Sequence, residues 1–142
     1  MNRRATRFVV LVALATATAG CSKDKDKAET LTDPNTMPTR YQTEIIATLR
    51  EQIFAKNDTT SITGAMISEP ALRQTGGGQH YVSCVRYTAH GVYGVTATVE
   101  RIGYFYGGHL NQLVETSGDE CKGVAYRPFS DLDKACIGKG CK

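Results

Sequence analysis

The stretch "VTATVERIGYFY", residues 95–106, decides the fold. Its first six side chains alternate between apolar and polar, in the order Val95, Thr96, Ala97, Thr98, Val99 and Glu100. A period of two is typical of a β-strand with one buried and one solvated face. The alternation slips at Arg101, so we expect a bulge near Gly103.

Three further strands are expected around this one, over residues 61–68, 80–89 and 109–115. Gly107 and Gly108 predict a tight hairpin between the strands 95–106 and 109–115. Pro70 ends the first strand, and "TGGGQ", residues 75–79, is typical of a loop. The sheet is therefore expected to be a four-stranded antiparallel meander.

Two helices are expected to flank the sheet. Residues 39–57 have apolar side chains at helical spacing on one stripe, namely Tyr41, Ile45, Ile46, Leu49, Ile53 and Phe54. A short helix over 131–137 is predicted by Ser130 as its N-cap and by two acidic residues in its first turn. We thus expect one α+β domain over residues 39–142, with an N-terminal amphipathic helix packed on the meander and a short C-terminal helix.

The N-terminus has the three parts of a secretory signal peptide. It is basic, with Arg3, Arg4 and Arg7, and then uncharged over residues 8–19. Twelve helical residues rise about 18 Å, which is short of the roughly 30 Å of a bilayer core. Residues 1–20 are therefore expected to be a signal peptide. Ordinary cleavage after Ala17-Thr18-Ala19 would release a soluble protein that begins at Gly20.

The stretch Thr18-Ala19-Gly20-Cys21 resembles the lipobox of bacterial lipoproteins, although Thr18 stands where that family usually has Leu. The resemblance implies that Cys21 is lipidated and becomes the new N-terminus. It also implies, from Ser22 in the next position, transfer to the outer membrane, facing the periplasm. The chain has five cysteines, and exported proteins seldom leave a thiol unpaired. A lipid on Cys21 leaves an even number of cysteines, which can all pair in disulfides.

Residues 21–38 are expected to form a lipidated, flexible tether, because they are too polar to bury much surface. The chain has 17 basic and 14 acidic residues. Three of the arginines lie in the signal peptide, so the mature chain is neutral. The basic balance of the whole sequence is therefore no indication of nucleic-acid binding.

The remaining cysteines, Cys84, Cys121, Cys136 and Cys141, are expected to form disulfides in an oxidising compartment. Three pairings are possible, and we favour Cys84 with Cys121 and Cys136 with Cys141. Cys136 shares a helix face with Leu132, which leaves a pairing towards the core open. A zinc site at Cys136 and Cys141 and a nucleophilic Cys84 beside Arg86 are the weaker alternatives.

Aromatic and imidazole side chains provide the candidate ligand-binding residues, which are Tyr87, Tyr104, Tyr106 and His109. Aromatic rings stack on sugars, but cross-strand aromatic pairs are also common in sheets. His80 and His109 fall at the same end of a meander, and without a placed carboxylate they make a poor metal site. No metal, cofactor or catalytic residue is predicted.

The stretches "YVSCVRY", residues 81–87, and "YFYGGHLNQLVE", residues 104–115, are similar to small exported proteins of alphaproteobacteria with no known role. That likeness implies no activity. We expect a non-enzymatic lipoprotein of the cell envelope that binds an envelope protein or has a structural role. The alternatives are a glycan- or lipid-binding module and an enzyme with His80 or His109 in a cleft.

Overall fold

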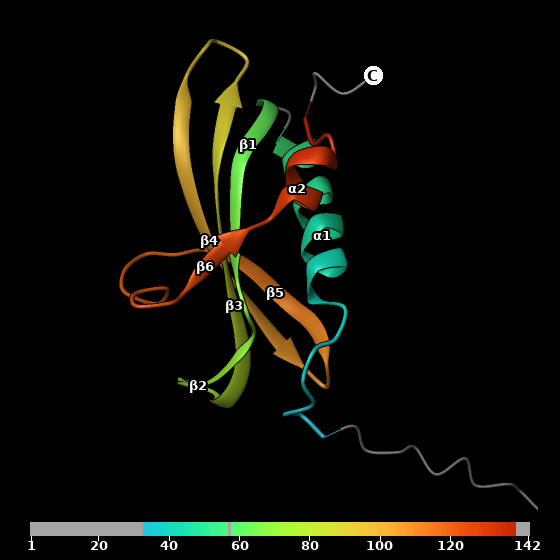
Figure 1. Ribbon diagram of the computed structural model, residues 1–142, viewed down its shortest axis with the longest axis vertical. Coiled ribbons are helices and arrows are strands. Elements are labelled where there is room, and N and C mark those ends of the chain that lie inside the picture. The colour runs from blue at the N-terminus through green and yellow to red at the C-terminus, as the bar shows by residue number, and fades with distance from the viewer. Residues whose placement is uncertain (1–32, 57, 139–142) are drawn as a thin grey trace, which may run out of the picture. The chain divides into compact units, whose positions relative to one another are not determined.

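Six antiparallel strands make up most of the protein in the computed structural model, which describes residues 33–56 and 58–138 (Figure 1). The strands are β1 (Thr59–Ser68), β2 (Ala71–Thr75), β3 (Gly78–Gly91), β4 (Thr96–Tyr106), β5 (His109–Glu115) and β6 (Tyr126–Pro128). The helices are α1 (Tyr41–Lys56), before the sheet, and α2 (Ser130–Lys134), after it.

The strands lie in the order β5-β4-β3-β1-β6, and β2 also pairs with β3. β1 pairs with the second half of β3, over 85–91, and β2 pairs with its first half, over 78–82. β1 and β2 therefore follow one another along the same edge of β3. The break between them falls at Glu69 and Pro70, where proline has no N–H to donate to a ladder.

The predicted α+β fold with a four-stranded meander is wrong, because the sheet has six strands and dominates the structure. Residues 75–79 are not a loop. Thr75 pairs with Gly78 across the tight turn at Gly76 and Gly77, so that β2 and β3 form a hairpin. β6 was not expected at all. It has only three residues, which is too short for a periodic pattern, and its partner β1 is far away in the sequence.

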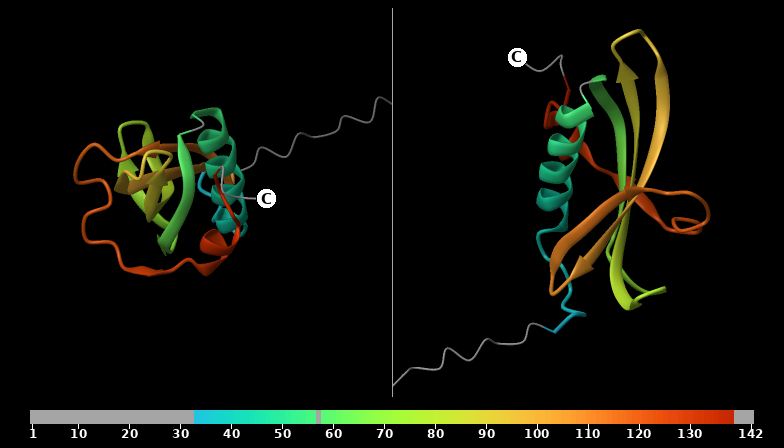
Figure 2. Two further views of the ribbon diagram at one scale, coloured as in Figure 1. Left: turned by 90° about the horizontal axis from the view of Figure 1, so that it is seen from above. Right: turned by 180° about the vertical axis from the view of Figure 1, so that it is seen from behind.

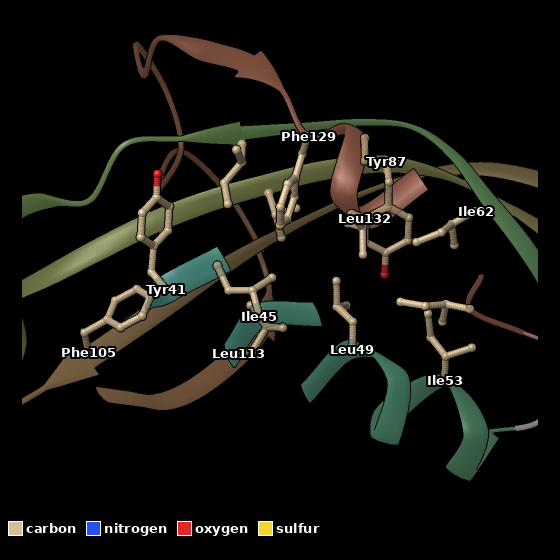
Figure 3. Close-up of a cluster of buried hydrophobic side chains, with 14 residues drawn as sticks. Tyr41, Ile45, Leu49, Ile53, Ile62, Tyr87, Phe105, Leu113, Phe129 and Leu132 are labelled. Atoms are coloured by element: carbon tan, nitrogen blue, oxygen red, sulfur yellow. The ribbon is translucent and has the colours of Figure 1, made fainter. Parts of the chain in front are cut away.

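The core lies between α1 and one face of the sheet. Tyr41, Ile45, Leu49 and Ile53 follow one another at four-residue spacing on α1 and are all buried. They point towards side chains from β1, β3, β4 and β5 and towards Phe129 and Leu132 (Figure 3). Burying each large apolar side chain stabilises the fold by roughly 1.5–3 kcal/mol.

A bulge in β1 docks the C-terminal helix. The pairing of β1 with β3 shifts between Thr63 and Met66, and Gly64 takes a φ of 63°. Ala65 then donates its N–H to Asp133 Oδ1 at 2.9 Å, and its C=O accepts the N–H of Phe129 at 2.8 Å.

The C-terminal helix differs from its prediction. α2 ends at Lys134 rather than at residue 137, and Ser130 is its first residue rather than its cap. The side chain of Asp133 accepts a hydrogen bond from β1, so that this residue joins α2 to the sheet.

The sheet has an irregularity near Gly103, as predicted, but Arg101 does not cause it. Arg101 keeps the alternation of β4, since its side chain lies on the helix side of the sheet and bonds to Gln52 of α1. The irregularity lies one step later, between Tyr104 and Phe105, where β5 has the extra residue Asn111.

The described chain begins beside the turn between β4 and β5. Gly107 donates its N–H to the C=O of Pro34 at 3.1 Å, and Pro38 is fully buried. Gly107 and Gly108 both have positive φ, as the predicted hairpin requires. β4 has 11 residues, so its two ends are roughly 33 Å apart. The turn between β3 and β4 therefore lies far from where the chain enters (Figure 1).

Candidate functional site

The sheet face opposite α1 has a small core of its own. It consists of Val82, Cys84, Ile102 and Cys121, and the segment after β5 covers it. Cys84 and Cys121 form the predicted disulfide, with a sequence separation of 37. Since Cys84 is buried and bonded, it does not serve as a nucleophile.

The second predicted disulfide is only partly visible. Cys136 is disulfide-bonded. Cys141 lies outside the described residues, as does Cys21, the predicted lipidation site. The pairing of Cys136 with Cys141 and the lipid on Cys21 therefore stay predictions.

Two adjacent hollows lie on this outer face, and they share Thr75, Gly76 and Tyr104 as walls. The first has a volume of about 310 Å³ and is lined on its far side by His80, Tyr106, Asn111 and Gln112. The second has about 350 Å³ and is lined by Arg73, Asp119 and Glu120 beside the disulfide. Both volumes are at the small end of the range of ligand sites. We call the pair of hollows the Tyr104 groove.

The walls of the Tyr104 groove are held by specific contacts. The rings of His80 and Tyr106 are 6.4 Å apart. Arg73 donates from Nη1 to the C=O of Glu120 at 2.9 Å, which ties β2 to the covering segment. Hydrogen bonds from main-chain N–H groups, its own first among them, lower the pKa of Glu120, which favours its charged carboxylate.

Only two of the four predicted ligand-binding residues lie in the Tyr104 groove. Tyr104 and Tyr106 line it, as the alternative hypothesis of a glycan-binding module requires. Tyr87 points to the opposite face, where it is buried and accepts a hydrogen bond from Arg101 Nε at 3.1 Å. Burial raises the pKa of Tyr87. His109 is directed to α1 instead.

His109 meets a carboxylate at the exposed surface. Its Nδ1 lies 3.0 Å from Oε1 of Glu44, while the imidazole is 78% exposed. Glu44 also accepts the N–H of Leu110 at 2.6 Å, so the pair joins the start of α1 to β5. His80 has Tyr106 as its neighbour instead. The two histidines do not share a site, and the described residues hold no group of three potential metal ligands.

One buried polar cluster was missed by sequence reasoning. Arg101 is 7% exposed and donates to three acceptors: Tyr87 Oη, Gln52 Oε1 at 2.6 Å and Glu115 Oε1 at 2.8 Å. Gln52 in turn donates to the C=O of Leu113 at 3.0 Å. The break in the alternation at Arg101 was the signal, but it marks a buried cation rather than a bulge.

A second surface feature is the hairpin of β3 and β4 beyond the end of β5, residues 88–99, which we call the β3–β4 arm. Its base packs against the core through Ala89 and Val99, and its tip extends beyond β5 (Figure 2). Tyr93 is 92% exposed, Val95 66% and Val92 39%. On the helix side the arm forms a shallow hollow of about 260 Å³ that includes Ala89 and Ala97. The half-buried pattern expected for 95–99 is therefore wrong at its start, where Val95 and Ala97 are solvated.

The opposite side of the arm is polar. His90 lies with Nε2 3.0 Å from Thr63 Oγ1 and Nδ1 3.4 Å from Thr96 Oγ1. From Tyr87 to Val99 the chain has no Asp, Glu, Lys or Arg. The arm is therefore an uncharged, two-sided ribbon, with an apolar side and a hydroxyl side.

Comparisons with models of protein families, with curated protein sequences and with solved structures gave no match to this chain. No helix of the described part is long and apolar enough to cross a membrane. A functional proposal therefore depends on the geometry of the Tyr104 groove and of the β3–β4 arm.

Proposed function

We propose that the protein is a lipid-anchored, non-enzymatic component of the bacterial cell envelope, and that its β3–β4 arm binds protein. The bonded state of the cysteines supports the proposed location in the cell envelope. Cys84 is bonded to Cys121, and Cys136 is bonded as well, which is the usage of an oxidising compartment. With Cys21 lipidated and Cys141 paired with Cys136, as proposed, every cysteine of the mature chain would have a chemical role.

The single observation that carries the binding role is the exposure of the arm. Soluble domains seldom leave a contiguous apolar patch in water unless something binds it. Here Tyr93, Val95 and Val92 are exposed together at one tip, with the shallow hollow beside them. Tyrosine is enriched at the centres of protein interfaces, because it contributes large contact area at a small entropic cost.

The position of the arm suits an anchored protein. The chain enters the domain beside the turn between β4 and β5, and the arm lies at the other end of β4. A lipid at the N-terminal end leaves the arm free to point away from the membrane that holds the protein. The arm is therefore proposed to meet its partner on the periplasmic side.

The anchor is tested by comparing the wild-type protein with Cys21→Ala. We expect wild type to fractionate with membranes and its intact mass to include acyl chains. Cys21→Ala is expected to stay in the soluble fraction or to keep its signal peptide. A wild-type protein that begins at Gly20 without acyl mass would contradict the proposed anchoring.

The arm is tested by capture from solubilised envelopes with the tagged mature protein. The double variant Tyr93→Ser/Val95→Ser is expected to lose its captured partner. The matched control is Met37→Ser/Leu72→Ser, which removes two exposed apolar side chains elsewhere on the domain. Equal capture by both variants would remove the arm as the binding surface.

The Tyr104 groove favours a second candidate function, the binding of a glycan. Tyr104 and Tyr106 offer aromatic rings, and Asn111 and Gln112 offer amides that can bond to hydroxyl groups. Purified peptidoglycan is the probe. Binding that is lost in Tyr104→Ala and kept in Tyr93→Ala would support the glycan function, and no binding by wild type would exclude this probe as its ligand.

A further inference from the structure

The outer edge of β4 has no neighbouring strand along the β3–β4 arm, as far as the described residues go. β5 pairs with β4 only from Tyr106 to Arg101. The last contact on this edge is the N–H of Thr116, which donates to the C=O of Glu100 at 3.0 Å. Beyond this point β4 continues to Thr96 beside β3 alone.

Main-chain groups alternate in direction along a strand, and two hydrogen bonds fix which residues face this open edge. Glu100 faces outwards, since its C=O bonds to Thr116. Val95 faces β3, since its C=O accepts the N–H of Gly91 at 2.7 Å. Thr96 and Thr98 therefore present their N–H and C=O groups at the open edge.

Edges of this kind are usually protected by charged side chains, proline or a bulge, because an open edge pairs with other strands. Residues 95–99 read Val-Thr-Ala-Thr-Val and contain none of these. Four of the five are β-branched, which favours the extended conformation. Thr96, Ala97 and Thr98 are also exposed.

The same five residues form a palindrome about Ala97, and this property indicates the partner. We propose that two copies of the protein pair through this edge, antiparallel and about a two-fold axis at Ala97. Val95 then lies opposite Val99 of the other copy, and Thr96 lies opposite Thr98. Each of the two Thr96–Thr98 pairs exchanges two N–H···O hydrogen bonds, because these are the residues that face the edge.

The side chains fit this register. Val95 and Ala97 lie on the apolar side of the arm, so pairing joins the apolar strips of the two copies. Thr96 and Thr98 lie on the hydroxyl side, and cross-strand threonine pairs are favourable. The pairing ends at Val99, because Thr116 of the same chain already occupies the edge beside Glu100. Antiparallel pairing places the two domain bodies at opposite ends of the paired strands.

This inference deepens the proposed function, since it names a second copy as a protein that the arm binds, and in part it rests on that function. A pairing of five residues is a small interface and is expected to be weak in dilute solution. Lipid anchoring confines the copies to one surface and raises their effective concentration, which favours a weak symmetric contact.

Sedimentation of the full mature protein in detergent tests the pairing. Wild type is expected to dimerise reversibly. Ala97→Lys places two ammonium groups against each other at the axis and is expected to weaken dimerisation by at least about tenfold. The control is Ala89→Lys, because Ala89 pairs with Ala97 on the same face but lies one strand away from the edge. Since Ala89 is partly buried against the core, circular dichroism first checks that this variant is folded, and its dimerisation constant is then expected to stay within about twofold of wild type.

Cysteine cross-linking tests the register. At the axis the two Ala97 Cα atoms lie about 4.5 Å apart, which a disulfide spans. Ala97→Cys is therefore expected to cross-link rapidly with itself, whereas in Ala89→Cys the thiols lie three strand spacings, roughly 14 Å, apart. Equal cross-linking in the two variants, or a wild type that is monomeric at every concentration in detergent and uncross-linked in membranes, would overturn the pairing.

The two proposals fail separately. Self-pairing would be refuted and the binding function kept if the wild type is monomeric but captures a partner that the variant Tyr93→Ser/Val95→Ser does not capture. A dimer that needs Ala97 while no other envelope protein is captured would support self-pairing as the function of the arm.

Discussion

Arg101 shows how one residue joins three elements. Its guanidinium is buried on the helix side of β4 and donates to side chains from β3, α1 and β5. A buried cation is tolerated when its hydrogen bonds are made, and the loss of one partner is costly. Arginine suits the position because its donors point in fixed directions, which lysine does not provide.

Arg101→Ala is expected to lower the free energy of unfolding by about 2–3 kcal/mol, since it leaves the buried hydroxyl of Tyr87 without its donor. The exposed carboxylate of Glu115 contributes little to this figure, because water solvates it. Urea unfolding measures the change. Arg40→Ala, at an exposed position before α1, is the control and should stay within about 0.5 kcal/mol of wild type. A similar value for Arg101→Ala would contradict the structural role of the cluster.

Tyr126 predicts how stability depends on pH. Burial, a hydrogen bond to Glu100 at 2.6 Å and the charge of that carboxylate raise the pKa of Tyr126 above its ordinary value of 10.0. A raised pKa means that the folded state holds the proton more tightly, so the stability it adds is present below pH 10 and is lost as pH rises further. Burial raises the pKa values of Tyr41 and Tyr87 in the same direction.

We therefore expect the free energy of unfolding to fall as pH rises above about 10, with a shallower fall in Tyr126→Phe. At neutral pH this variant should lose about 1 kcal/mol, the value of one hydrogen bond. Urea titrations at several alkaline pH values measure both effects. An identical pH dependence in the two proteins would rule out a contribution from Tyr126.

The direction of single side chains was the least predictable feature of the site. β3 is buried on both faces over 82–85, so its composition does not tell which face Tyr87 takes. Tyr104 lines a groove, while Tyr87 belongs to the core on the other side. Only the position of α1, which no local pattern reveals, separates the two faces.

At the scale of elements, the long periodic segments were predictable and the short ones were not. The observed bounds are close to the expected ones for α1 and for four of the strands, namely β1, β3, β4 and β5. β2 follows a proline and precedes three glycines, so local chemistry favours a loop there. It becomes a strand because β3 is long enough to pair with both β1 and β2.

The disulfide is the element-scale constraint on the outer face. It fixes the covering segment, and with it Asp119 and Glu120 of the Tyr104 groove. The double variant Cys84→Ala/Cys121→Ala is expected to lose about 4 kcal/mol of stability, the loop entropy of a ring of this size. Urea unfolding without reductant provides the measurement. A loss below about 1 kcal/mol would show that the segment is held by packing instead.

At the scale of the whole molecule, the C-terminal segment with β6 and α2 packs into the same core as α1. β6 pairs with β1, and α2 docks on the bulge of β1. Phe129, Leu132 and Ile137 are nearly inaccessible to solvent in the same cluster as the residues of α1. These contacts join segments that are far apart in sequence, which a local pattern cannot show.

A chain that stops at Val124 is expected to be largely unfolded. It loses three buried side chains worth roughly 1.5–3 kcal/mol each, against a total stability of about 5–15 kcal/mol for a domain. Circular dichroism and urea titration of the shortened chain measure this directly. Adding a peptide of residues 125–142 should restore part of the folded signal, and a shortened chain as stable as wild type would contradict the role of β6 and α2.

The pairing of β6 with β1 has a consequence for the proposed export of the chain. An unfolded chain whose last residues were still in the cytoplasm would lack the outer neighbour of β1 and the core residues Phe129 and Leu132. Under the proposed export, the domain would therefore close only after nearly the whole chain had crossed the membrane. Late closure would keep the chain in a transportable state and would delay compact folding until the chain reached the proposed oxidising compartment.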